Sequence, residues 1–164
     1  MAAIRTMVDD IERETPLSFF NYGASYRAAA DTLMRSEHRS THPHAPVQSL
    51  YYHAIELVLQ GFLRANGVSV AALKRMGHQL DKLQSQAVKL GLQFDQEDSA
   101  VIESISAGDL WSHSRYLVTG FRRDLPLSHL ASACRRVEDS VAAALMARGL
   151  LTRRLRSKAA KLTN

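Results

Sequence analysis

The amino-acid sequence predicts an all-α fold, a single bundle of four or five helices in up-and-down order. Apolar residues recur at steps of three and four through most of the 164 residues, which is the spacing of one buried helix face. No segment shows the sustained apolar–polar alternation with β-branched residues that is typical of strands. Glycines and prolines separate the periodic segments at short intervals, so consecutive helices should pack side by side.

The first helix is expected over 19–37, with Pro16 and Ser18 just before it. The segment 39–46 that follows should be a loop, because its two prolines remove amide donors and break a helix. The apolar spacing of the first helix predicts a core-facing side made of Phe19, Tyr22, Tyr26, Ala29, Ala30 and Leu33.

The second helix is expected over 46–65 and is the most apolar element, so it should lie at the centre of the bundle. Pro46 suits its first turn, where an amide hydrogen has no acceptor within the helix. Asn66 and Gly67 suit its end, because glycine readily adopts the left-handed conformation that follows a helix.

A short helix over 70–76, closed by Gly77, is expected next, followed by helices over 78–90, 95–107 and 128–150. Asp95 and Ser128 are the predicted N-caps of the last two helices, because their side-chain oxygens can accept a hydrogen bond from a first-turn amide. The segment 109–126 shows no regular pattern.

Charge divides the chain into a helical domain, 1–150, and a basic tail, 151–164. The net charge is +5, yet six of the 21 Lys and Arg residues lie in the last 17 residues, which contain no Asp or Glu. The rest of the chain, with 15 basic against 16 acidic residues, is close to neutral. A basic tail can hold RNA or another polyanion through phosphate contacts, and it can equally be a solvated helix end. Its cations are Arg153, Arg154, Arg156, Lys158 and Lys161.

Composition excludes several classes of protein. The single cysteine, Cys134, rules out an intramolecular disulfide framework and a cysteine-rich zinc site. No apolar run is long enough to span a bilayer, and the first residues mix acidic and basic side chains as no secretory signal does. We therefore expect a cytoplasmic protein with no membrane partner. No pattern for a metal site or a cofactor is present in the sequence.

Three segments in a fixed order resemble one family. The first is SLYYHAIELVLQGFLRANG at 49–67, the second is MGHQLDKL at 76–83, and the third is SRYLVTGFRRDLP at 114–126. An "AIEL" helix, a "GHxLxxL" start and a late "RY" are similar to the HEPN superfamily, and the resemblance covers about residues 22–147. It implies a helical bundle that often forms a homodimer. Many members are metal-independent ribonucleases, toxins or RNA-processing subunits, and others are inactive partners or nucleotide binders.

The resemblance also implies where a nuclease pair would lie. Nuclease members carry an Arg and, about four to six residues later, a His, because RNA cleavage needs a proton-transfer group and a fixed cation for the phosphate. Arg115 falls where the resemblance places that Arg, but no His stands at 120–122. A second match, Arg123 with His129, has five residues between its members, and Pro126 interrupts it. Arg123 and His129 are therefore the predicted catalytic residues if the chain is a ribonuclease.

A second set of polar residues is a candidate for ligand binding or for a structural cluster. Glu56 lies on the most apolar helix, and an inward carboxylate there would need a partner, for which Arg115 is our first candidate. The alternative is that Glu56 faces solvent at the edge of the helix. His78, at the start of a helix, either lines a site with Arg115 and Tyr116 or only anchors its own turn.

Three hypotheses for function follow from these residues. The preferred one is a non-catalytic HEPN-type module that binds a nucleotide, RNA or a partner protein. The second is a metal-independent, toxin-like HEPN ribonuclease that uses Arg123 and His129. The third is a purely structural or regulatory homodimer without a ligand site.

Overall fold

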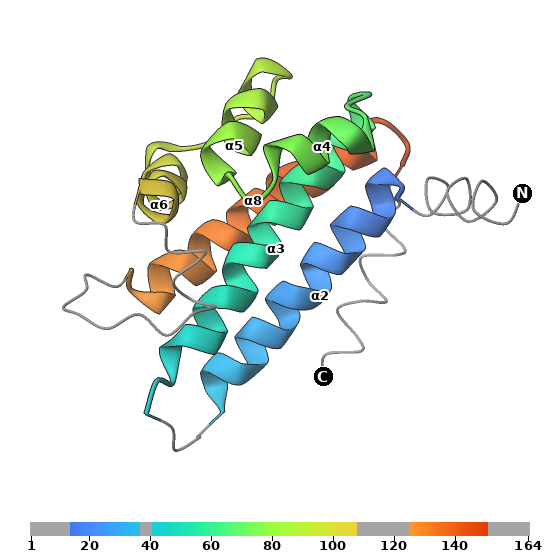
Figure 1. Cartoon of the computed structure of the whole chain (residues 1–164). Coiled ribbons are helices and arrows are strands. Elements are labelled where there is room, and N and C mark those ends of the chain that lie inside the picture. The colour runs from blue at the N-terminus through green and yellow to red at the C-terminus, as the bar shows by residue number, and fades with distance from the viewer. Residues whose placement is uncertain (1–13, 37–40, 108–124, 151–164) are drawn as a thin grey trace, which may run out of the picture.

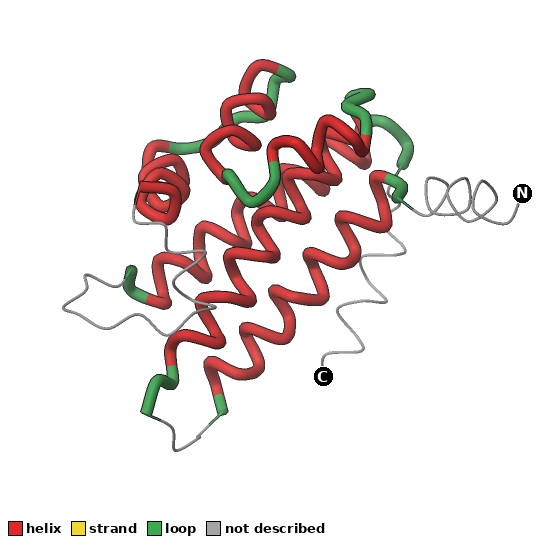
Figure 2. The backbone as a smooth tube through the Cα atoms, in the orientation of Figure 1, coloured by secondary structure: helices red, strands yellow, loops and turns green. Residues whose placement is uncertain are grey.

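A computed structural model describes residues 14–36, 41–107 and 125–150 of the chain (Figure 1). Figure 2 shows that every regular element within these ranges is a helix, so the predicted all-α bundle is confirmed. Among the described helices, none combines the length and the apolar character needed to cross a bilayer. The six helices are α2 (Pro16–Arg35), α3 (His44–Ala65), α4 (Val70–Met76), α5 (Leu80–Lys89), α6 (Gln96–Ala107) and α8 (Leu127–Ala147).

The three long helices α2, α3 and α8 form the body of the bundle (Figure 1). Helix α2 is antiparallel to α3. The end of α3 accordingly lies beside the start of α2, where the Arg64 side chain donates a hydrogen bond to the Glu14 carbonyl at 3.2 Å. Helix α8 runs in the same direction as α3, since Arg148 after α8 donates to Asn66 after α3, at 2.5 Å. The shorter helices α4, α5 and α6 lie on the connection between these two parallel helices.

Helix α3 is the centre of the core, as its composition predicts. Fourteen of its 22 residues are buried, including Tyr51, Ile55, Leu59 and Phe62. Each fully buried side chain of this size stabilises the fold by about 1.5–3 kcal/mol relative to an exposed one. The helix is thus covered on most sides, and a polar residue on it must find its hydrogen-bond partners inside the protein.

Two glycines let α2 and α3 approach closely. A Cβ atom on Gly23 of α2 would lie 2.7 Å from Val58 Cγ2 and 2.9 Å from the Ala54 carbonyl oxygen. A Cβ atom on Gly61 of α3 would lie 3.0 Å from the Pro16 carbonyl oxygen. Both distances to backbone oxygen are shorter than ordinary van der Waals contact, so a side chain at Gly23 would force α2 and α3 apart and one at Gly61 would crowd the start of α2.

A network of polar side chains joins the three long helices. Arg27 of α2 donates to Asp31 at 2.6 Å and to Glu138 of α8 at 2.5 Å. The Tyr51 hydroxyl of α3 donates to Asp31 at 2.6 Å. Burial raises the pKa of the Tyr51 phenol, and its hydrogen bond to Asp31 raises that pKa further. Burial also raises the pKa of the Cys134 thiol on α8, so this cysteine is an inert core residue.

The helix boundaries correct three expectations. Helix α2 begins at Pro16 rather than 19, because the Thr15 side chain caps it by accepting the Ser18 amide at 3.0 Å. Helix α3 begins at His44 inside the predicted loop, since Pro46 falls in the first turn, where its missing amide costs nothing. Ser128 is not an N-cap: Pro126 holds that position, and Ser128 lies within α8. Asp95 is confirmed as a cap, accepting the Asp98 amide at 2.7 Å.

We expect Gly23→Ala to lower the free energy of unfolding, measured by urea denaturation, by about 1–3 kcal/mol. The added methyl group meets Val58 and the Ala54 carbonyl, and overpacking of this kind typically costs that much. Combining the substitution with Val58→Ala should recover part of the loss, because the nearest clashing atom is removed. A Gly23→Ala protein as stable as the wild type would contradict the close contact of α2 and α3.

Candidate functional site: a buried glutamate held by two histidines

Glu56 is a buried carboxylate on the central helix, with 3% of its surface exposed. Removing a carboxylate from water is costly unless the protein supplies hydrogen bonds in return. The His78 Nδ1 atom supplies them: it lies 2.9 Å from Oε1 and 3.0 Å from Oε2 of Glu56. The alternative that Glu56 faces solvent at the edge of its helix is therefore wrong.

Two further partners come from α3 itself. Gln60 lies one helical turn after Glu56 and donates from Nε2 to Oε1 at 3.1 Å. His53 lies three residues before Glu56, on the same face, with its Nδ1 3.4 Å from Oε2. We name these four residues, His53, Glu56, Gln60 and His78, the Glu56 cluster.

The turn between α4 and α5 brings His78 back to α3. Helix α4 ends at Met76, and Gly77 adopts φ 57°, a left-handed value that glycine accepts without strain. The Gly77 amide donates to the Leu73 carbonyl at 3.0 Å, which closes the helix. His78 follows directly and turns toward Glu56, so the pair ties the α4–α5 turn to the centre of the bundle.

The hydrogen-bond chemistry fixes the orientation of the His78 ring. A carboxylate oxygen only accepts hydrogen bonds, so the Nδ1 atom of His78 is the donor. The other edge of the ring, with Nε2, is turned away from Glu56. The His78 side chain is 52% exposed and that of His53 is 32% exposed, whereas that of Glu56 is 4% exposed. The cluster thus presents imidazole groups to solvent and keeps its negative charge behind them.

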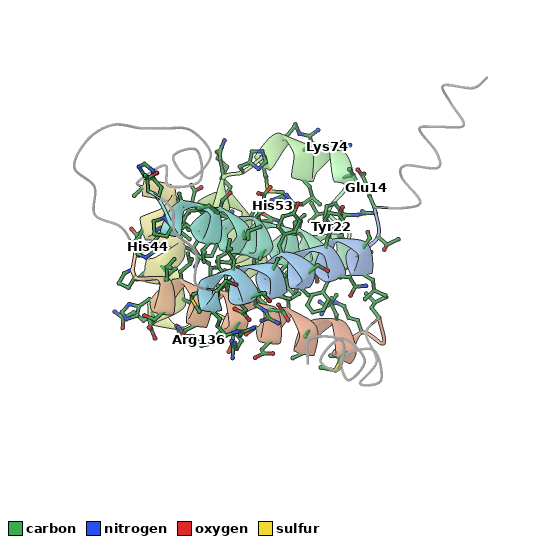
Figure 3. The ribbon with its side chains drawn as sticks, turned by 90° about the horizontal axis from the view of Figure 1, so that it is seen from below. Glu14, Tyr22, His44, His53, Lys74 and Arg136 are labelled. Carbon is green, nitrogen blue, oxygen red and sulfur yellow. The ribbon has the colours of Figure 1, made fainter. Side chains whose placement is uncertain are left out.

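Aromatic rings of α2 continue this surface. The Tyr26 and His53 rings meet edge to face with centroids 4.5 Å apart, and the Tyr22 ring lies 5.9 Å from that of Tyr26. Figure 3 shows Tyr22 and His53 on the same side of the molecule, with Lys74 of α4 nearby. Together, Tyr22, Tyr26 and His53 form what we call the ring row.

The position of Tyr22 corrects an expectation. Its apolar spacing predicts a place in the core, but Tyr22 is 64% exposed, and Ala29 is exposed as well. The close contact at Gly23 turns a different side of α2 inward. The buried residues of α2 are Phe20, Gly23, Ala30 and Asp31.

The other predicted site residues are placed as follows. His129 lies in the first turn of α8 and is exposed. Its expected partner Arg123 lies outside the described residues, as do Arg115 and Tyr116, so neither predicted pairing is tested. The cations of the basic tail at 151–164 also lie outside them. Of the predicted polar cluster, the described structure brings Glu56 and His78 together.

Neither the groove between α5 and α6 nor the acidic and histidine side chains of the described residues form a second candidate site. An open groove of about 860 Å³ lies between α5 and α6, and polar side chains such as Gln84, Ser99 and Ser106 line much of it. Gln84 donates to the Ser99 hydroxyl at 3.2 Å, and the Ser106 hydroxyl accepts from the Asp81 amide at 3.2 Å, so these side chains already have hydrogen-bond partners. Within 14–36, 41–107 and 125–150, no three His, Cys, Asp or Glu side chains are arranged to hold a metal ion.

Comparison of the chain with protein-family models, with curated proteins and with solved structures gave no match. The resemblance to the HEPN superfamily therefore rests on the motifs at 49–67, 76–83 and 114–126. The Glu56 cluster joins the first two of these motifs in space, because Glu56 belongs to "AIEL" and His78 to "GHxLxxL".

We expect Glu56 and His78 to be energetically coupled. In a double-mutant cycle of Glu56→Gln and His78→Ala, the coupling free energy from urea unfolding should be about 0.5–1.5 kcal/mol, typical of one hydrogen bond. A matched cycle of Glu56→Gln with His44→Ala should give no coupling, because His44 lies more than two turns before His53 on α3. Additive effects of Glu56→Gln and His78→Ala would show that the contact contributes nothing.

Proposed function

We propose that this protein is a non-catalytic helical module of the HEPN type that binds a nucleotide or RNA through the Glu56 cluster. The observation that carries the proposal is the arrangement of charge and exposure in the cluster. A carboxylate that is almost fully buried holds two imidazoles that are a third to a half exposed. An imidazole held in this way is an oriented donor for a phosphate group when it is protonated.

The orientation matters because a mobile side chain loses rotamer entropy when it binds a ligand. Glu56 holds His78 before the ligand arrives, and Tyr26 packs against the ring of His53. Both rings are thus fixed on rigid helices or on a turn closed by glycine, which lowers the cost of binding. This is the arrangement expected of a binding site rather than of a surface loop.

The resemblance to the HEPN superfamily supports a phosphate-bearing ligand, since it implies RNA processing or nucleotide binding. The homodimer and the cytoplasmic location belong to the same proposal. The ribonuclease alternative stays a prediction for Arg123 and His129. The structural or regulatory homodimer is the outcome if neither RNA nor nucleotide binds.

The test is binding of a fluorescent single-stranded RNA of mixed sequence, measured by anisotropy at low salt. His78→Ala should raise the Kd by about 10-fold or more, because a hydrogen bond to a charged group contributes about 1.5–3 kcal/mol. Mononucleotides should compete with the RNA, since they offer the same phosphate.

His44→Ala is the matched control, because His44, like His78, is an exposed histidine, but it is the first residue of α3 and lies apart from His53 (Figure 3). It should leave the Kd unchanged. The proposal fails if the wild-type protein binds neither RNA nor nucleotide at low salt, or if His78→Ala and His44→Ala have the same effect.

A further inference from the structure

We infer that the ring row, Tyr22, Tyr26 and His53, is a stacking surface for an unpaired base, so that the ligand of the proposed site is single-stranded RNA rather than a duplex. The inference rests on the proposed function and adds the form of the nucleic acid. The first observation is an aromatic side chain that lies on the surface although its spacing on the helix predicts a buried position. Tyr22 is 64% exposed, and no other large apolar side chain among the described residues is as exposed.

The exposure of Tyr22 is a property of the helix packing. The contact at Gly23 turns one side of α2 toward α3. Tyr22 and Tyr26, which are one helical turn apart, lie at the border of that side. Tyr26 is half-buried against His53, whereas Tyr22 extends outward from it. An aromatic ring that the packing does not need is a candidate for contact with a ligand.

The neighbours of the ring row select the ligand. His53 belongs both to the ring row and to the Glu56 cluster, so the phosphate-binding imidazoles and the tyrosine rings form one continuous surface. The Lys74 side chain, 72% exposed, lies on the same side of the molecule (Figure 3). Of the acidic groups described here, Glu56 lies behind the imidazoles with 4% of its side chain exposed, and Glu14 pairs with Lys74 at 3.4 Å, so the imidazoles rather than Lys74 are the main donors for phosphate.

A flat ring next to donors for phosphate fits a nucleotide unit whose base is free to stack. Every base has a π-face, so such stacking does not depend on sequence, and it contributes about 1–3 kcal/mol per base. A duplex keeps its bases stacked inside and offers this surface only its phosphates. The ring row should therefore discriminate between single and double strands rather than between sequences.

The experiment compares one RNA strand of mixed sequence, alone and paired with its complement, by fluorescence anisotropy with the full chain. Tyr22→Leu should weaken binding of the single strand by at least about 5-fold, the lower end of base stacking. It should leave binding of the duplex unchanged. Tyr22→Phe keeps the ring and should bind the single strand like the wild type.

Val88→Ala is the matched control, because Val88 is an exposed apolar residue of α5 outside the ring row. It should not change either affinity. The urea unfolding midpoint of each variant is measured first and should match that of the wild type, because side chains as exposed as Tyr22 and Val88 contribute little to stability.

The outcomes separate this inference from the proposed function. If His78→Ala weakens RNA binding but Tyr22→Leu does not, the stacking surface is wrong and the proposed site stands. The inference is also wrong if the duplex binds as tightly as the single strand, or if Tyr22→Leu weakens both equally. If the wild type binds neither RNA nor nucleotide, or if neither substitution has an effect, both proposals fall. If the wild type binds a nucleotide but no RNA, this inference alone is wrong.

Discussion

The close contact of α2 with α3 sets the geometry on which the rest of the structure depends. A methyl group on Gly23 would clash with the Ala54 carbonyl and one on Gly61 would crowd the Pro16 carbonyl, so the two glycines favour one rotation of α2 relative to α3. That rotation places Asp31 beside the Tyr51 hydroxyl inside the bundle. It also places Tyr26 on His53 and leaves Tyr22 outside. The core network and the proposed binding surface are therefore two consequences of the same helix contact.

The buried charge of Glu56 is the second constraint, and it explains why the site takes its form. A lone carboxylate at the centre of an apolar helix would destabilise the fold, so its partners must be close and well oriented. Gln60 and His53 come from the same helix, but His78 must come from elsewhere, and the left-handed turn at Gly77 delivers it. The energy that stabilises the buried charge thus also fixes the imidazole that we propose binds phosphate.

The periodic spacing of apolar residues was sufficient to predict the helices. The apolar composition of α3 predicted its central position, and the capping oxygen of Asp95 predicted the start of α6, because each of these signals lies within a short stretch of sequence. Apolar spacing did not predict which side of α2 is buried, because the packing of the neighbouring helix determines that side. Tyr22 has the spacing of a core residue, and only the contact of Gly23 with Val58 and Ala54 shows that another side of α2 is buried. The Glu56–His78 contact spans 22 residues of sequence and depends on the direction of the turn at Gly77. Gln60, one helical turn after Glu56, could have been identified from the i, i+4 spacing alone.

The tautomer of His78 tests the central claim, that Glu56 holds this imidazole by its Nδ1 atom. Long-range ¹H–¹⁵N NMR of the imidazole nitrogens reports which one carries the proton. The spectrum is recorded under alkaline conditions, so that the signals of the neutral ring report its tautomer. The account predicts that His78 is protonated at Nδ1 in the wild type and that Glu56→Leu abolishes this preference. A neutral His78 protonated at Nε2 in the wild type would contradict it.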